Sequence, residues 1–127
     1  MLLLLYVAIG GAVGAAARYL LTSFVTRMAG SGYPYYGTFA VNLSGCFAMG
    51  VLIGFFAQIM PRGKELHALL ALGMLSSFTT FSAFSMETFL LYERQGIVAA
   101  SGYALASIIT SVLALVLGMW MFRQFAA

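Results

Sequence analysis

The sequence predicts an all-α membrane protein with four transmembrane helices, organised as a single domain over residues 1–127. Hydrophobic residues make up 63% of the chain and charged residues only 7%, which gives a mean hydropathy of +1.02. A soluble domain carries about 25% charged residues, so a surface of this composition belongs in a bilayer. The composition excludes a soluble enzyme and a disordered chain, and it predicts a multi-pass protein of the cell membrane.

Four apolar segments are each long enough to cross the hydrocarbon core, which takes about 20 helical residues. We expect spans at about residues 2–26, 37–60, 66–91 and 97–121. The first should be retained, because no basic segment precedes it as in a signal peptide. Three short segments rich in charge, glycine or proline separate the spans, at residues 27–36, 61–65 and 92–96, and are typical of loops. Since lipid satisfies no main-chain group, the spans should be helices.

The basic residues give almost no preference for one orientation in the membrane. The termini and the second loop share one side, with Arg62, Lys64 and Arg123, and the other side has Arg27 and Arg94. Because Lys and Arg normally concentrate on the cytoplasmic side, three against two is a weak bias. Either the chain inserts both ways and two opposed copies pair as an antiparallel dimer, or Arg18 and lipid contacts select one topology.

Small residues in the first two spans predict close helix packing. Gly10 and Gly14 form one pair at a spacing of four, and Gly50 and Gly54 form another. Such pairs let helix backbones approach where no hydrophobic drive exists between helices. We expect a tight bundle.

Three polar residues within the spans need partners. Arg18 carries a permanent charge, so it either faces a water-filled vestibule or reaches the headgroups from near the helix end. Asn42 can offer two N–H donors, either to an anion or to a neighbouring helix. Glu87 is the only carboxylate within a span, and we expect it to bond to hydroxyl groups near the interface.

The densest polar segment is residues 76–87, SSFTTFSAFSME, in which seven of twelve residues are Ser, Thr or Glu. Phe78, Phe81 and Phe84 recur every three residues and predict one stripe along a helix, whose ring edges carry partial positive charge. Hydroxyl groups that bond to carbonyls of the preceding turn loosen a helix. The patch therefore predicts a broken helix that exposes carbonyls for cations and N–H groups for anions. The alternative is a regular helix with packed rings and internally bonded hydroxyls.

The fourth span carries hydroxyl groups on one helical face, at steps i, i+4, i+7 and i+8. They belong to Tyr103, Ser107, Thr110 and Ser111. Hydroxyls in a row can serve as donors along an anion route, or they can bond within their own helix.

Taken together, these segments resemble the Fluc (CrcB) family of small fluoride channels. The likeness covers nearly the whole chain: GGAVGAAARY with Arg18, GTFAVNLSG with Asn42, TTFSAFSME in the third span, and the Tyr103–Ser107–Ser111 spacing. It implies a fluoride-specific channel for passive export that lowers cytoplasmic fluoride, built as an antiparallel dual-topology dimer with two pores. It also implies a structural sodium ion at the dimer centre, where the third helix breaks.

The resemblance assigns roles to individual residues. It implies a fluoride path along Phe81, Phe84, Asn42, Tyr103, Ser107, Ser111, Thr80, Ser82 and Glu87, with Arg18 in the vestibule. It places sodium on the main-chain carbonyls of Ser76 and Thr79. Ser76 and Ser77 stand where the family usually has two glycines, so the partner is either an identical chain or a related subunit that supplies the glycine.

A small multidrug antiporter, likewise of four helices, is the alternative from another class, and a non-transporting scaffold is a third. Such antiporters use a carboxylate deep in the first helix to exchange protons for a cationic drug. Here the one charged residue of the first span is Arg18, which favours an anion path. With one histidine, no aspartate and a lone Cys46, the chain has no enzymatic constellation. Its basic residues do not cluster, so no nucleic-acid partner is expected.

Overall fold

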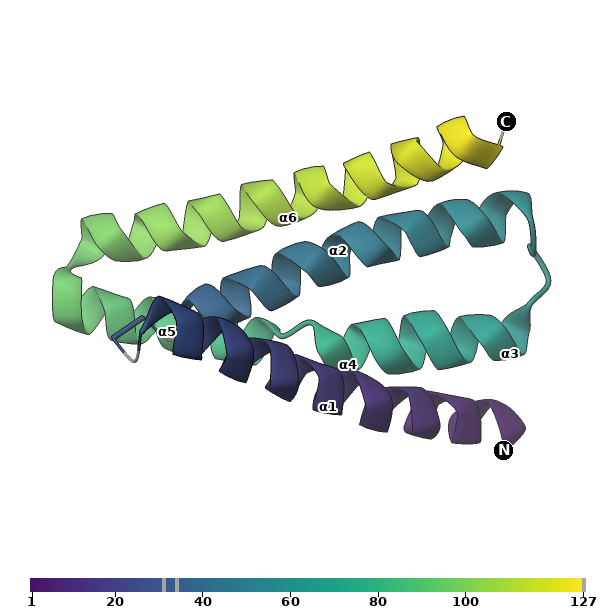
Figure 1. Cartoon of the computed structure of the whole chain (residues 1–127), viewed down its shortest axis with the longest axis horizontal. Helices are drawn as coiled ribbons and strands as arrows, with labels where there is room; N and C mark the ends of the chain where they lie inside the picture. The colour runs from purple at the N-terminus through teal and green to yellow at the C-terminus, as the bar shows by residue number, and fades with distance from the viewer. Residues whose placement is uncertain (31, 34, 127) are drawn as a thin grey trace.

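The computed structural model describes residues 1–30, 32–33 and 35–126, which form long helices joined by short connections (Figure 1). In chain order the elements are α1 (Leu2–Ala29), α2 (Tyr35–Gln58), α3 (Lys64–His67), η1 (Ala68–Leu75), α4 (Ser76–Phe78), α5 (Phe81–Gln95) and α6 (Ile97–Ala126). The π-helical η1 continues α3 into α4, so α3 to α5 make up the third span. Within the described ranges, four segments are long and apolar enough to cross a membrane, which confirms the four-span fold.

The helices extend further into the predicted loops than the sequence indicated. In the loop predicted at residues 27–36, Ser31 and Pro34 lie outside the described residues. The turn predicted at residues 92–96 is wrong, because α5 continues to Gln95 and only Gly96 separates it from α6. Gly96 has φ +86°, a conformation that glycine adopts without steric cost, so a single residue reverses the chain.

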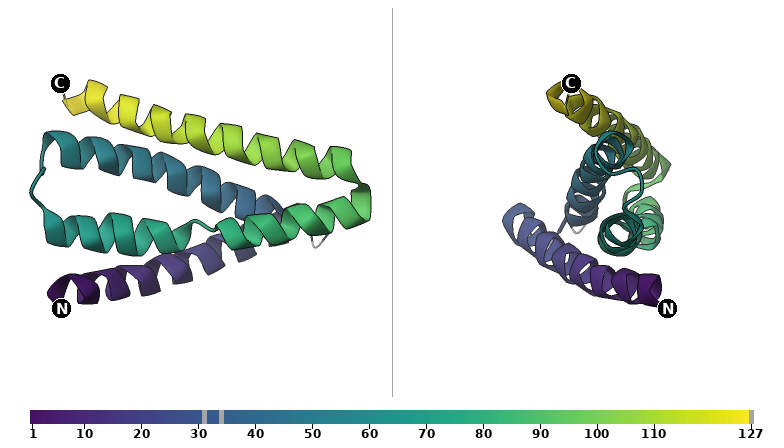
Figure 2. Two further views of the ribbon diagram at one scale, coloured as in Figure 1. Left: turned by 180° about the vertical axis from the view of Figure 1, so that it is seen from behind. Right: turned by 90° about the vertical axis from the view of Figure 1, so that its right-hand side faces the viewer.

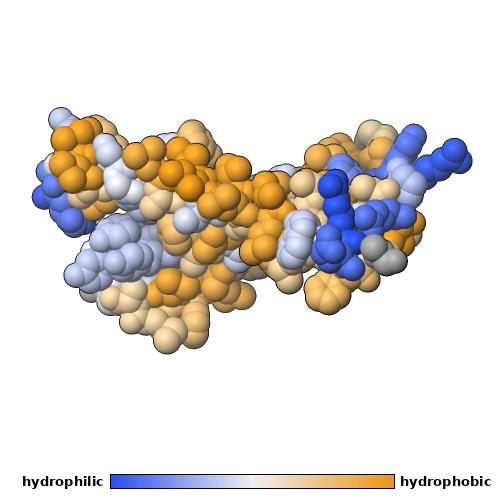
Figure 3. All heavy atoms as spheres, turned by 90° about the horizontal axis from the view of Figure 1, so that it is seen from above, coloured by the Kyte–Doolittle hydropathy of each residue, from blue (hydrophilic) through white to orange (hydrophobic). Residues whose placement is uncertain are grey.

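The bundle has two distinct ends. Both termini lie at the end that holds the α2–α3 connection, and the α1–α2 and α5–α6 connections lie at the other end (Figures 1 and 2). Hydrophilic residues gather toward these two ends on the face shown in Figure 3, with apolar residues over most of the middle. This distribution matches a bundle that crosses a bilayer, with its connections in the headgroup regions.

Glycines bring the helix backbones into direct contact, which confirms the predicted packing role. A Cβ atom at Gly10 would overlap the main chain of Leu69, and one at Gly14 would overlap that of Met74. These contacts hold α1 against η1. At Gly50, a Cβ atom would overlap the main chain of α6 in the same way, so α2 and α6 form the second close pair.

The third span is broken between α4 and α5, as predicted. Thr79 has φ −76° and ψ 157°, and Thr80 has φ −148° and ψ 117°, so both are extended. Ser76 and Ser77 are still helical, and the break therefore begins later than Ser76. Two extended residues carry the chain from one helix to the next in the middle of the span (Figure 1).

The break also divides the predicted phenylalanine stripe. Phe78 ends α4, whereas Phe81 and Phe84 belong to α5. Residues on opposite sides of extended backbone no longer follow the helical period, so the prediction of one stripe through all three rings is wrong. Phe78 instead lies over Gly45, where a Cβ atom would come 2.9 Å from its Cδ1.

Candidate functional site

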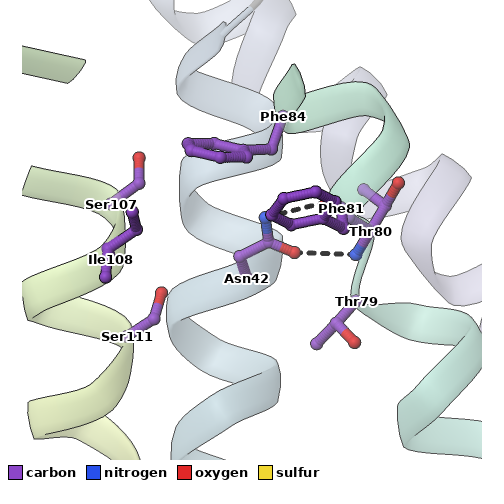
Figure 4. A pocket seen from close by; sticks show the side chains of 8 residues that line it. All are labelled: Asn42, Thr79, Thr80, Phe81, Phe84, Ser107, Ile108 and Ser111. Atoms are coloured by element: carbon purple, nitrogen blue, oxygen red, sulfur yellow. Dashed lines mark hydrogen bonds between the residues drawn. The ribbon is translucent and has the colours of Figure 1, made fainter. Parts of the chain in front are cut away.

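A cavity of about 210 Å³ lies where the break in the third span faces α2 and α6 (Figure 4). Its lining consists of Asn42, Thr79, Thr80, Phe81, Phe84, Ser107, Ile108 and Ser111. All except Ile108 were predicted as site residues. The break brings together residues from three spans that are far apart in the sequence.

The side chain of Asn42 pairs with the main chain of Thr80. Its Oδ1 accepts the N–H of Thr80 at 2.8 Å, and its Nδ2 donates to the carbonyl of Thr80 at 3.1 Å (Figure 4). Both main-chain groups of a residue outside the helical ladder are thereby satisfied, as a position inside a membrane requires. Asn42 thus bonds to the neighbouring span and keeps one N–H for another acceptor.

Threonine side chains form hydrogen bonds at the end of α4 and at the start of α5. Thr79 Oγ1 donates to the Leu75 carbonyl at 3.2 Å, beside the bond of its own N–H to that carbonyl at 3.1 Å. Thr80 Oγ1 accepts the N–H of Ala83 at 3.2 Å and so caps the start of α5. A helix N-terminus carries partial positive charge, and α5 therefore begins with its positive end at the cavity.

The carbonyls of Ser76 and Thr79 lose their helical donors at the break. In a continuous α-helix they would accept the N–H groups of Thr80 and Ala83. The N–H of Thr80 goes to Asn42 instead, and that of Ala83 goes to Thr80 Oγ1. Carbonyl oxygens of this kind can replace the hydration shell of a hard cation, so the main chain here fits a sodium ion.

Two aromatic rings of α5 bound the cavity with very different exposure. The ring centroids of Phe81 and Phe84 are 5.5 Å apart, and the Phe84 ring is 5.7 Å from that of Tyr103. Phe84 is 8% exposed and Phe81 is 77% exposed. A single chain therefore encloses the cavity on the Phe84 side and leaves Phe81 uncovered.

The wall formed by α6 presents hydroxyl groups to the cavity. Ser107 and Ser111 lie on α6, across from Asn42 and the two phenylalanines (Figure 4). Ser107 is 5% exposed, and its Oγ has no hydrogen-bond partner within the described ranges. A buried polar group left unpaired costs about 1–3 kcal/mol, so this hydroxyl gains from any partner that a small rearrangement of its side chain would bring within reach.

Glu87 lies one turn beyond Phe84 and accepts two hydrogen bonds from hydroxyl groups, as the sequence predicted. Thr38 Oγ1 donates to Oε1 at 2.7 Å, and the Tyr103 hydroxyl donates to Oε2 at 3.0 Å. Thr38 was not among the site residues predicted from the sequence. Its spacing of four from Asn42 places both on one face of α2, and this spacing could have identified it.

Other predicted residues lie beside the cavity without lining it. Ser82 Oγ is 3.3 Å from Thr80 Oγ1, and Ser76 Oγ donates to the Ala71 carbonyl at 2.9 Å. Arg18 is half-buried on α1, one turn beyond Gly14. Since Gly14 packs on Met74 and α1 runs parallel to η1, Arg18 lies close to the level of the break.

Comparison with known proteins identifies the family. The family model described as "CrcB-like protein, Camphor Resistance (CrcB)" matches residues 5–119. The chain is 46% identical over 121 residues to the "Fluoride-specific ion channel FluC" of Chelativorans sp. (strain BNC1), covering 95% of this chain and 96% of that one. It is 44% identical over 127 residues to the FluC of Rhodospirillum centenum, covering both chains completely. The chain therefore belongs to the CrcB family.

Proposed function

We propose that the protein is a fluoride-specific ion channel, not an enzyme, that lets fluoride leave the cytoplasm passively. The observation that carries this function is the cavity at the break of the third span, which is lined by polar side chains of Asn42, Ser107 and Ser111 and by the rings of Phe81 and Phe84. No carboxylate or cationic side chain lines this cavity among the described residues. The names of the relatives, which are fluoride-specific ion channels, support the same conclusion.

Selection for fluoride follows from the kind of donors around the cavity. A narrow path must replace the hydration shell of a small anion with donors held in place. Ser107 and Ser111 supply hydroxyls, Asn42 supplies its remaining N–H, and the rings of Phe81 and Phe84 supply electropositive edges. Chloride is larger and binds such a set less closely, so it should pass much more slowly.

The remaining predicted residues extend the path beyond the cavity. Thr80 lines the cavity itself, Ser82 adds a hydroxyl beside it, and Tyr103 continues the path toward the α5–α6 end with its hydroxyl donated to Glu87. Glu87 holds the hydroxyls of Tyr103 and Thr38 in fixed orientations rather than binding the anion itself, since an ionised carboxylate has no donor. Arg18, as a permanent cation in the vestibule, raises the local concentration of anions.

The working unit in this proposal is an antiparallel homodimer with dual topology. Phe81 is 77% exposed, and Ser76 and Ser82 are exposed in the middle of a span. A second copy related by a twofold axis would cover this exposed ring and the polar residues beside it. The nearly balanced basic residues of the two sides allow the opposed orientation that this pairing needs.

A sodium ion would be held by the carbonyls of Ser76 and Thr79 from each of the two chains. When bound, the ion offsets the mutual repulsion of the carbonyl dipoles and adds positive potential beside the anion paths. Because the ligands are main-chain atoms, serine at position 76 can serve as well as glycine, provided that its carbonyl stays free of a helical bond.

Ion efflux from liposomes that contain only this chain tests the function. We expect fast release of fluoride and little release of chloride under the same gradient. Equal rates for the two anions would contradict fluoride selectivity. Proton-driven uptake of a cationic dye would instead indicate the antiporter, and absence of any flux would indicate a scaffold.

A further inference from the structure

We propose that Asn42 is a positioning residue. Its hydrogen bonds to Thr80 keep the third span from forming a continuous helix, and this one interaction leaves both a main-chain carbonyl free for sodium and main-chain N–H groups free for fluoride. The inference rests on the proposed function and adds a coupling between the two ions. It assigns Asn42 a role distinct from direct donation to the anion.

The local sequence does not force the chain to break where it does. Residues 76–81, SSFTTF, contain neither proline nor glycine, the residues that usually interrupt a helix. Thr79 and Thr80 are β-branched, which lowers helix propensity only slightly. A partner from elsewhere in the fold must therefore compete with the helical hydrogen bond at this point.

Asn42 is that partner, because it occupies the N–H that regular helix would use. The N–H of Thr80 has two possible acceptors, the carbonyl of Ser76 in a continuous helix and Oδ1 of Asn42. The structure has the second, at 2.8 Å, and Nδ2 closes the pair at 3.1 Å on the carbonyl of Thr80. The side-chain amide of Asn42 thus makes the hydrogen bonds to Thr80 that a continuous helix would make with its own main chain.

On one side of the break, this pairing frees an oxygen for a cation. The carbonyl of Ser76 remains without its helical donor only while the N–H of Thr80 is held by Asn42. If that N–H returned to Ser76, the oxygen would be engaged and one ligand per chain would be lost. The affinity for sodium should therefore depend on Asn42, although Asn42 supplies no ligand itself.

On the other side, the same pairing creates a helix start at the cavity. The 15-residue helix α5 begins at Phe81, and the N–H of Ala83 is already taken by Thr80. The N–H groups of Phe81 and Ser82 are then the free donors of the first turn. Ser107 lines the same cavity from α6, and its Oγ has no hydrogen-bond partner within the described residues.

Two roles for Asn42 make different predictions. If Asn42 only donated its spare N–H to fluoride, its loss would slow transport and leave sodium binding unchanged. If it holds the break, its loss returns the N–H of Thr80 to Ser76, and both ions are affected. Sodium binding, measured apart from transport, separates the two.

The test uses the full-length protein in detergent. Its thermal unfolding midpoint is followed against sodium concentration, with N-methyl-D-glucamine replacing sodium at constant ionic strength. In Asn42→Leu and Asn42→Ala we expect the sodium concentration for half-maximal stabilisation to rise at least about tenfold, the usual scale of coupling between two sites. Leucine keeps the branching of asparagine at Cγ without its polar atoms, and alanine avoids any overpacking.

Two matched variants serve as controls. Ser107→Ala removes a cavity hydroxyl without touching the pairing, so it should slow fluoride efflux and leave the sodium midpoint within about twofold. Ser44→Ala lies two residues from Asn42 on α2, and its hydroxyl bonds only to carbonyls of its own helix at 2.7 and 3.3 Å. It should change neither measurement.

Several results would overturn the inference. One is a sodium midpoint in both Asn42 variants within about twofold of the parent. Another is a parent protein whose unfolding is indifferent to sodium. A third is failure of both Asn42 variants to fold while Ser107→Ala folds, because the inference expects regular helix and not an unfolded span. If the Asn42 variants lose sodium stabilisation but the parent passes no fluoride, the inference stands and the proposed function fails.

Discussion

The amide of Asn42 and the main chain of Thr80 face each other across the break, with Oδ1 at 2.8 Å from the Thr80 nitrogen and Nδ2 at 3.1 Å from its carbonyl oxygen. A side chain of α2 thus takes the place of the helical ladder in the third span. The cavity, the start of α5 and the free carbonyls of the break all lie around this pair.

Replacing either ring of the cavity by an aliphatic side chain should stop transport. In Phe81→Ile and Phe84→Ile we expect fluoride efflux to fall at least about tenfold, the effect of losing roughly 1.4 kcal/mol of ion binding, because isoleucine has no electropositive edge. Phe89→Ile is the control, since Phe89 is an exposed ring of α5 outside the cavity. Normal efflux in both cavity variants, with folded protein in size-exclusion chromatography, would mean that these rings only pack.

A carboxylate at position 42 should also impair transport. In Asn42→Asp, an oxygen replaces the Nδ2 that now lies 3.1 Å from the Thr80 carbonyl, so an attraction becomes a repulsion. The negative charge would in addition repel fluoride in the cavity. Efflux of fluoride from liposomes measures the loss. A rate equal to that of the parent would show that neither the lost hydrogen bond nor the added charge affects fluoride transport.

The hydrogen bond between Thr38 and Glu87 should contribute measurably to stability. Thr38 is buried, and Thr38→Val removes the 2.7 Å bond while keeping the shape of the side chain. We expect a loss of about 1.5–3 kcal/mol in the free energy of unfolding, as for other hydrogen bonds to charged groups. Thr110→Val is the matched control, because the Thr110 hydroxyl bonds only to Ala106 of its own helix. Equal stabilities of the two variants would contradict the prediction.

The contact of α1 with η1 should not tolerate a methyl group at Gly14. Its Cβ atom would overlap the main chain of Met74, so Gly14→Ala should cost about 1–3 kcal/mol of stability through overpacking. Gly102→Ala places the same methyl group on α6 where nothing lies within 4 Å. Thermal unfolding in detergent should show a lower midpoint for the first variant and an unchanged or higher one for the second. A Gly14 variant as stable as the parent would contradict the close contact.

Activity should require sodium, and sodium binding should persist when the Ser76 side chain is removed. The Ser76 hydroxyl bonds to the Ala71 carbonyl, and the proposed ligand is the main-chain oxygen. Ser76→Ala should therefore keep fluoride efflux and its sodium dependence, whereas replacing sodium with a large organic cation should lower both efflux and dimer stability. Indifference of the parent protein to the cation would refute the sodium site.

Composition and local spacing were enough to predict much of the fold. The four spans follow from the length of apolar helix that a bilayer requires. The contacts at Gly10 and Gly14 follow from small residues at a spacing of four, and the irregular part of the third span follows from the hydroxyls of residues 76–87. These features depend on residues close in sequence, together with the demand of hydrocarbon for internal hydrogen bonds.

Tertiary structure alone decided where the third span breaks and which side chains meet there. The position of the break, after Phe78 rather than at Ser76, results from competition between a helical bond and the amide of Asn42, which is 38 residues away from Thr80 in the chain. A residue so distant leaves no trace in local periodicity, and the sequence therefore predicted one stripe of three rings where the structure divides them. The spacing of Thr38 from Asn42 indicates the face of α2 on which it lies, but its bond to Glu87 joins two spans and exists only once the helices have packed.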